Sequence, residues 1–277
     1  MSVLLGASGW SYDDWVGPFY PPGTVPRDYL AHYAKRFGAV EIDSTFYAIP
    51  ALATVQGWAD RTPEGFLFAP KIPGTVTHGA QGERPVPDRV LVDAEGQLEV
   101  FLHRASILGP KLACVVFQFP YFRVKEFSLS QFLPRLASTL ARLPAGVRAA
   151  VEVRNRTWIV PDYLALLQEH RAAAVLVDHP YMPFPEEQIQ LGMVTTDFAY
   201  LRLLGDRYAI EKKTKTWGAT VEDRSERLGR WAQIIRSIAS RSGLRDVYAF
   251  SNNHFAGHAP ATCIELGRLV GTISEPS

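Results

Sequence analysis

Short apolar runs recur along the chain and alternate with amphipathic stretches. Eight of these runs predict β-strands, at residues 4–8, 39–43, 66–72, 112–119, 149–154, 174–178, 199–204 and 246–251. Most of the runs are continuously apolar, which is typical of a parallel sheet whose outer face is covered by helices. The pattern therefore indicates strands that are buried on both faces.

Helical periodicity fills the gaps between the predicted strands. The first predicted helix begins at Pro26 and ends before Gly38, and others are predicted around residues 52–58, 98–108, 132–140, 161–167, 228–238 and 261–270. The polar, Pro- and Gly-rich stretch 74–95 predicts a long loop. Strand–helix alternation of this kind predicts an α/β fold, a TIM-like (β/α)8 barrel in a single domain over residues 1–277. A doubly wound open sheet is the alternative, but no Gly-rich dinucleotide fingerprint follows the first strand.

Composition fits one globular barrel. The chain has 277 residues, of which 47% are hydrophobic, so a large core is expected and wholesale disorder is excluded. The net charge of +1 neither favours nor excludes a polyanionic partner. Because neither a signal-peptide pattern nor a long apolar window is present, we expect a cytoplasmic protein with no membrane partner.

Polar residues follow nearly every predicted strand, and in barrels of this kind such positions line the active site. The segment 40–47 is the most informative, because Glu41 and Asp43 lie two apart in a strand and point to the same face. Two like charges in an apolar setting are costly unless another group pairs with them. We expect the mouth of the barrel to be a ligand site.

Four carboxylates are the candidates for catalysis: Glu41, Asp43, Glu152 and Asp178. Glu41 and Glu152 could act as a general acid–base pair. The alternative is that one or both pair with Lys71 or Arg202 in a structural ion network.

Three cations could form an anion pocket if they converge, because guanidinium groups bind phosphate or carboxylate through two parallel hydrogen bonds. They are Lys71, Arg154 and Arg202. The alternative is that they only balance the acidic residues. Other residues expected to bind the substrate are His78, Gln118, Asn252 and Asn253.

Aromatic residues in the loops after the first, second and fifth strands could stack on a sugar ring or a nucleobase. They are Trp10, Tyr12, Trp15, Phe46, Tyr47 and Trp158. Packing within the loops is the alternative for each of them.

No metal or other cofactor is predicted, although a divalent metal is kept as an alternative. Its ligands would be His78, Glu152, Asp178 and His179, since metal-dependent barrels combine histidines and carboxylates from several strand ends. Against it, no His-x-Glu, His-x-His or Cys-rich spacing is present.

Charge is concentrated in the region 202–245, with eleven Lys or Arg and five Asp or Glu. This region could contact nucleic acid, with Lys212, Lys213 and Lys215 between Tyr208 and Trp217. The alternative is a solvated helix and loop surface.

Several motifs resemble one known family. The segments 6–12 (GASGWSY) and 41–47 (EIDSTFY), with later matches at 118–120 (QFP), 150–154 (AVEVR) and 251–253 (SNN), are similar to the YecE-like family, domain of unknown function 72. The resemblance covers essentially the whole chain and implies a TIM-barrel-like fold, but no established activity. Two departures are the segments 202–205 (RLLG), where the family often has Arg-x-His-Gly, and 262–263 (TC), where Asn-Ala is common.

The favoured function is an enzyme or binding protein for a small anionic ligand, bearing phosphate or sugar, at the C-terminal mouth of the barrel. For an enzyme, acid–base chemistry of the hydrolase or isomerase/lyase type is favoured. The alternatives are a metal-dependent enzyme similar to phosphodiesterases or endonucleases, and a nucleic-acid-binding module without catalysis. The family resemblance adds that some relatives are compared with metal-dependent endonuclease and isomerase barrels, an analogy of fold alone.

Overall fold

A computed structural model describes residues 2–81 and 84–272, and its eight strands form an all-parallel barrel. The strands are β1 (Ser2–Ala7), β2 (Ala39–Ile42), β3 (Leu67–Pro70), β4 (Val115–Gln118), β5 (Ala149–Glu152), β6 (Ala173–Asp178), β7 (Phe198–Leu203) and β8 (Asp246–Ser251). Six of them pair in the order β1-β8-β7-β6-β5-β4, and β2 pairs with β3. Isolated bridges close the ring: Ser8 with Glu41 on one side, and Lys71 with Val116 on the other.

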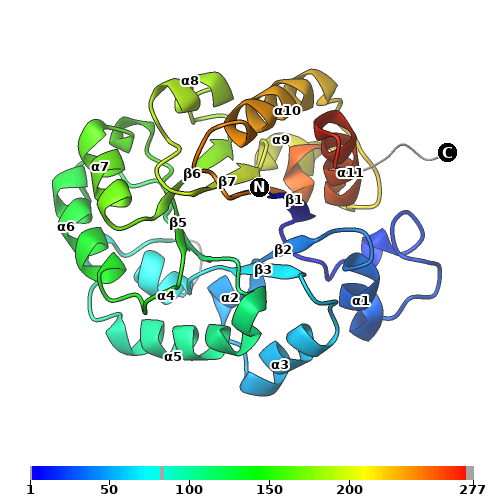
Figure 1. Cartoon of the computed structure of the whole chain (residues 1–277), viewed down its shortest axis with the longest axis horizontal. Helices are drawn as coiled ribbons and strands as arrows, with labels where there is room; N and C mark the ends of the chain where they lie inside the picture. Colours follow the sequence, from blue (N-terminus) through cyan, green and yellow to red (C-terminus); the bar gives the residue numbers. More distant parts are fainter. Residues whose placement is uncertain (1, 82–83, 273–277) are drawn as a thin grey trace.

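Helices surround the strands, and Figure 1 shows them as an outer ring. The α-helices are α1 (Tyr29–Tyr33), α2 (Ser44–Tyr47), α3 (Leu52–Asp60), α4 (Gly74–Thr77), α5 (Glu95–Ala105), α6 (Leu129–Leu140), α7 (Pro161–Glu169), α8 (Pro185–Gln190), α9 (Arg207–Lys213), α10 (Ser225–Ala239) and α11 (Ala259–Val270). Short 3-10 helices are η1 (Asp13–Trp15), η2 (Pro26–Asp28), η3 (Pro87–Arg89), η4 (Ser106–Lys111), η5 (Arg156–Trp158) and η6 (Asn253–Phe255).

The predicted barrel and all eight predicted strands are confirmed. Most predicted helices are present too, but the first one begins as the 3-10 turn η2 and its α-helical part ends at Tyr33, before the expected limit. The predicted loop 74–95 contains α4 and η3, and residues 82–83 of it lie outside the described part. The helices α2, α8 and α9 were not predicted, because elements of four to seven residues are too short to display a helical period.

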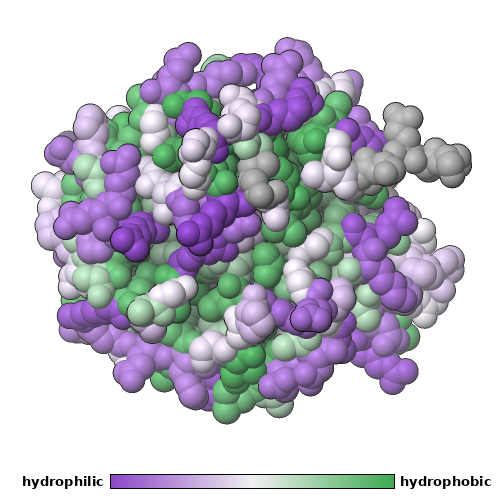
Figure 2. All heavy atoms as spheres, in the orientation of Figure 1, coloured by the Kyte–Doolittle hydropathy of each residue, from purple (hydrophilic) through white to green (hydrophobic). Residues whose placement is uncertain are grey.

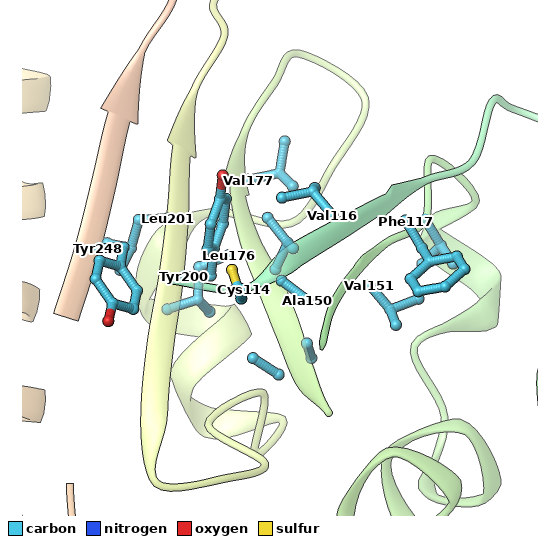
Figure 3. Close-up of a cluster of buried hydrophobic side chains, with 14 of the residues drawn as sticks. Cys114, Val116, Phe117, Ala150, Val151, Leu176, Val177, Tyr200, Leu201 and Tyr248 are labelled. Atoms are coloured by element: carbon cyan, nitrogen blue, oxygen red, sulfur yellow. The ribbon is translucent and has the colours of Figure 1, made fainter. Parts of the chain in front are cut away.

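The strands separate two layers of core side chains. Figure 3 shows Cys114, Val116 and Tyr200 between the strands, while Phe117 and Val151 lie on the opposite side of β4 and β5. All five are fully buried. Alternation along each strand therefore sends one set of side chains into the barrel and the next set toward the helices.

The surface is mixed in polarity. In Figure 2 hydrophilic residues are spread around the periphery of one face, with hydrophobic residues between them. Among the described residues, no helix combines the length and the apolar character needed to cross a bilayer.

Candidate functional site

Inward side chains near the carboxyl ends of five strands meet inside the barrel. Strand register sets them on the same face, because Gln118 on β4 is aligned with Glu152 on β5. Arg202 on β7 reaches both of these residues, as well as Glu41 on β2. Lys71 follows β3 and completes the set.

Arg202 is the centre of this network and is 1% exposed. Its Nη2 donates to Glu41 Oε1 at 2.8 Å, and its Nη1 donates to Gln118 Oε1 at 3.0 Å and also to Glu152 Oε2. The Tyr200 hydroxyl donates to the other oxygen of Glu41 at 2.7 Å. Burial by itself lowers the pKa of Arg202, but the charges of Glu152 and Glu41 outweigh it and raise that pKa well above its usual value.

Two further cations complete the charge balance of the network. Lys71 Nζ pairs with Asp43, donates to Gln118 Oε1 at 2.9 Å and lies 3.7 Å from Glu41 Oε1. Arg154 Nε donates to Glu152. Three carboxylates thus face three cations, so the predicted ion network is present and the group as a whole is close to neutral.

Glu41 and Glu152 are fully buried in this network, which bears directly on the predicted acid–base pair. Burial alone would raise the pKa of Glu152, but the charges of Arg154 and Arg202 lower it to about 2. Asp43 differs, since about 29% of its side chain is exposed. Burial also acts to raise the pKa of Asp43, and Lys71 and Arg202 together lower it.

A cavity of about 1080 Å³ opens above the network at the C-terminal ends of the strands. Eleven of the predicted catalytic and binding residues line it: Tyr12, Asp43, Phe46, Tyr47, Lys71, His78, Gln118, Arg154, Arg202, Asn252 and Asn253. The structure therefore brings together most of the residues that were expected at the mouth. Their roles stay predictions.

Asp178 does not reach this cavity, and its predicted place at the mouth is wrong. Its neighbour Val177 is in register with Arg202 and points inward, so Asp178 points outward to the helices. There its Oδ2 accepts hydrogen bonds from Arg227 Nε and Trp231 Nε1, each at 2.6 Å. Asp178 therefore fastens α10 to β6.

Three of the six predicted aromatic residues also lie elsewhere. Trp15 is fully buried and stacks on Tyr12 at 4.6 Å, and Trp10 packs edge-on against Trp58 at 5.6 Å. Trp158 is buried against Phe132. Trp15 and Trp158 are buried core residues, and Trp10 is half-buried against a core cluster. Loop packing was the alternative interpretation for each of them.

Two histidines in the cavity wall are neutral at physiological pH. Burial, followed by the charges of Lys71 and Arg154, lowers the pKa of His78 to about 4. Burial and the charge of Arg154 lower the pKa of His179 to about 4 as well. Neutral imidazoles can serve as hydrogen-bond donors or acceptors toward a ligand.

Sequence reasoning missed much of the upper wall. The cavity residues that were not predicted to bind a ligand include Tyr121, Arg156, Tyr181, Leu204, Arg207, Tyr208, Trp217 and His254, and His179 was considered only as a metal ligand. Most stand in loops or in the short helix α9, where no period or spacing marks them. The large exposure of Tyr121, Tyr181 and Tyr208, between 63% and 76%, places these tyrosines at the cavity rim.

The four residues proposed as metal ligands are not brought together. Asp178 faces the helices, and Glu152 is engaged by two arginines. Within residues 2–81 and 84–272, no group of three or more His, Cys, Asp or Glu side chains has a geometry that could hold a metal ion.

Most charges of the basic region 202–245 have acidic or backbone partners. The ion pairs include Arg207 with Glu211, Lys213 with Glu222, Arg227 with Asp178, Arg230 with Glu186 and Arg245 with Asp197. This pairing reduces the positive charge that a polyanion would meet.

Comparison with known proteins identifies the family. A family model described as a protein of unknown function, DUF72, matches residues 4–276. The chain belongs to this family. The chain is similar to the UPF0759 protein YunF of Bacillus subtilis, 32% identical over 164 residues, which are 58% of this chain and 54% of YunF. YecE of Escherichia coli is 30% identical over 170 residues, which are 61% of this chain and 53% of YecE. The aligned part of the chain thus spans about half the length of these curated relatives.

Solved structures agree on the fold. A DUF72 family protein from Thermotoga maritima matches 98% of this chain and 100% of its own, with a TM-score of 0.70 and 24% identity. One from Enterococcus faecalis matches 99% of this chain and 98% of its own, with a TM-score of 0.68 and 21% identity. A D-psicose 3-epimerase matches 90% of this chain and 84% of its own at a TM-score of 0.53 and 12% identity, a likeness of fold alone.

Proposed function

We propose that the cavity binds a small anionic ligand and that Arg154 is the residue that holds its charge. Arg154 lines the cavity, and its side chain is 21% exposed. Its Nε is used by Glu152, whereas its two terminal nitrogens have no hydrogen-bond partner among the described residues. This free end of a fixed guanidinium is the observation that carries the proposal, because it can bind phosphate or carboxylate through two parallel bonds.

Cationic side chains line the cavity, although each of them also has a carboxylate partner. Lys71 and Arg202 belong to the nearly neutral network. Arg156 pairs with Glu187 and Arg207 with Glu211. The support for an anion therefore comes from the terminal nitrogens of Arg154 and not from the net charge of the wall. Aromatic rings such as Tyr12 and Phe46 stand beside them and offer a surface for the remainder of the ligand, for which a sugar ring is suitable. The large volume is at the upper end of the range for small-molecule sites.

Should the ligand be a substrate, proton transfer falls to Asp43 rather than to Glu41 or Glu152. Asp43 is the predicted catalytic carboxylate that lines the cavity, and Lys71 holds it as a carboxylate able to accept a proton.

The two alternative functions have weaker support. The four candidate metal ligands do not lie together, and most cations of the region 202–245 have acidic or backbone partners. The cytoplasmic location stays a prediction.

Calorimetric titration of the protein with inorganic phosphate and with a hexose phosphate tests the proposal. Arg154→Gln is expected to weaken binding at least about tenfold, since it removes a charged donor worth about 1.5–3 kcal/mol. Arg154→Lys keeps the positive charge but loses the paired terminal nitrogens of the guanidinium group. Its affinity for the anion should lie between those of Arg154→Gln and the original protein. The control is Arg245→Gln, an exposed arginine at the opposite end of the barrel. Equal affinity of Arg154→Gln and the original protein would rule the proposal out.

A further inference from the structure

The orientation of one cavity amide is fixed by its neighbours. Gln118 Oε1 accepts hydrogen bonds from Lys71 Nζ at 2.9 Å and from Arg202 Nη1 at 3.0 Å. The amide cannot be turned over, because its NH2 group would then meet two cationic donors. Gln118 Nε2 therefore faces the cavity as a donor, and it has no partner among the described residues.

The two cavity asparagines are oriented in the same sense. Asn252 Oδ1 accepts a hydrogen bond from the backbone N–H of His254 at 3.0 Å. Asn253 Oδ1 accepts one from the backbone N–H of Ala259 at 2.9 Å. Asn252 Oδ1 also lies 2.7 Å from His254 Nδ1. The protein thus engages the oxygen of each amide, whereas the NH2 groups of these amides have no hydrogen-bond partner among the described residues, so the amides can donate to acceptors in a ligand.

His179 adds a donor of the same kind. The backbone N–H of Tyr181 donates to His179 Nδ1 at 3.3 Å, which requires a lone pair on that nitrogen. In the neutral ring the proton is then on Nε2. The lowered pKa of His179, caused by burial and by Arg154, keeps the ring neutral at pH 7.

Gln118, Arg154 and His179 lie at the carboxyl ends of three consecutive strands, Gln118 as the last residue of β4 and the other two just after β5 and β6. Gln118 is aligned with Glu152, Arg154 follows two residues later, and His179 directly follows the neighbouring β6. Hydrogen bonds link Gln118 to Arg154 through Arg202 and Glu152. The charge of Arg154 also acts on His179, which requires the two side chains to be close.

We propose that Gln118 Nε2, the terminal nitrogens of Arg154 and His179 Nε2 form a donor-only seat for one multi-oxygen anionic group, a phosphate or a carboxylate. The proposal deepens the proposed function and rests on it. A sugar hydroxyl both donates and accepts, so this seat selects the acidic group of the ligand and not its hydroxyls. Asp43 lies beside Lys71 and is left for another part of the ligand.

The variant Gln118→Glu removes the NH2 donor of Gln118 but keeps an oxygen that can accept from Lys71 and Arg202. A second carboxylate oxygen takes the place of the NH2 group. We expect phosphate binding, measured by calorimetry at pH 7.5, to weaken about 10- to 100-fold, with a melting temperature equal to or above the original. Gln168→Glu makes the same charge change at an exposed position of α7 and should bind as the original protein does.

His179→Ala is the second variant and should weaken phosphate binding about five- to tenfold without touching the ion network. Parallel titrations with phosphate and with malonate identify the acidic group, the tighter of the two being the one that fits. Unchanged affinity in Gln118→Glu would overturn the seat, while a loss in Arg154→Gln would leave the proposed function standing. A protein that binds neither anion would overturn both proposals.

Discussion

At the scale of single residues, carboxylates at neighbouring strand ends differ in their burial and in their ion-pair partners. Glu41 and Glu152 are fully buried among Arg202, Arg154 and Tyr200, whereas Asp43 is partly exposed in the cavity. Their sequence context predicted that they would gather at the mouth and left open whether they were catalytic or structural. Burial and ion pairing favour the structural role for the two glutamates. For Glu152, a pKa lowered to about 2 also means that the group is ionised at neutral pH and has no proton to donate.

The stability of the protein should fall in mild acid because of His78. The folded protein binds the proton of His78 only near pH 4, whereas the unfolded chain binds it near pH 6.5. Between these values the unfolded state carries the extra proton, so the free energy of unfolding decreases as the pH falls. One pKa unit corresponds to about 1.4 kcal/mol, which gives roughly 3 kcal/mol for this residue. Below about pH 4.5 the loss continues, since Glu152 keeps its charge in the folded state down to about pH 2.

Urea unfolding at pH 7, 6, 5 and 4.5 measures this dependence. His78→Asn is expected to reduce the slope between pH 6.5 and 4, and His103→Asn, on the exposed surface of α5, is the control. An identical slope in His78→Asn and the original protein would contradict the assignment.

At the scale of elements, strand register decides which polar residue reaches the site. Asp178 and His179 are adjacent in sequence, yet the first faces α10 and the second faces the cavity. The boundaries of β6 were predicted well, but a shift of one residue reverses the direction of a side chain. Prediction of a strand end to within one or two residues therefore cannot fix which side chain points into the site.

Asp178→Asn should weaken the attachment of α10. It removes the charge that accepts hydrogen bonds from Arg227 and Trp231, so we expect the free energy of unfolding to drop by about 1.5–3 kcal/mol. Phosphate affinity should be unchanged. A double-mutant cycle with Arg227→Gln measures the coupling, and the two losses should not add. If Asp178→Asn left the stability unchanged and abolished anion binding, Asp178 would belong to the ligand site, which would contradict its assignment to the attachment of α10.

At the scale of the whole molecule, closure of the barrel creates the network. At two seams the two sheets are joined by isolated bridges instead of a continuous ladder, and one of these bridges joins Ser8 to Glu41. Close approach of the backbones at this seam depends on Gly6, where an added Cβ would stand 2.0 Å from the carbonyl oxygen of Ala39 and 2.8 Å from the Tyr33 hydroxyl. This approach brings Glu41 across to Arg202.

Gly6→Ala is therefore expected to be severely destabilising, by more than about 3 kcal/mol, because backbone must move at the seam. Gly229→Ala is the matched control, since an added Cβ there meets nothing within 4 Å in α10. In a helix this change should stabilise by about 0.5–1 kcal/mol. Thermal unfolding of both variants is the measurement, and a Gly6→Ala protein as stable as the original would contradict this account of the seam.

The sequence by itself determined the barrel, its eight strands, the family and eleven of the residues that line the cavity. Apolar runs and helical periods are local properties, and polar residues that follow such runs must collect at one end of a parallel barrel. The tertiary structure alone decided which carboxylates are buried, which tryptophans are core, and how Gln118 and His179 present their donors. Those outcomes depend on register and closure between strands far apart in sequence, and no local pattern encodes them.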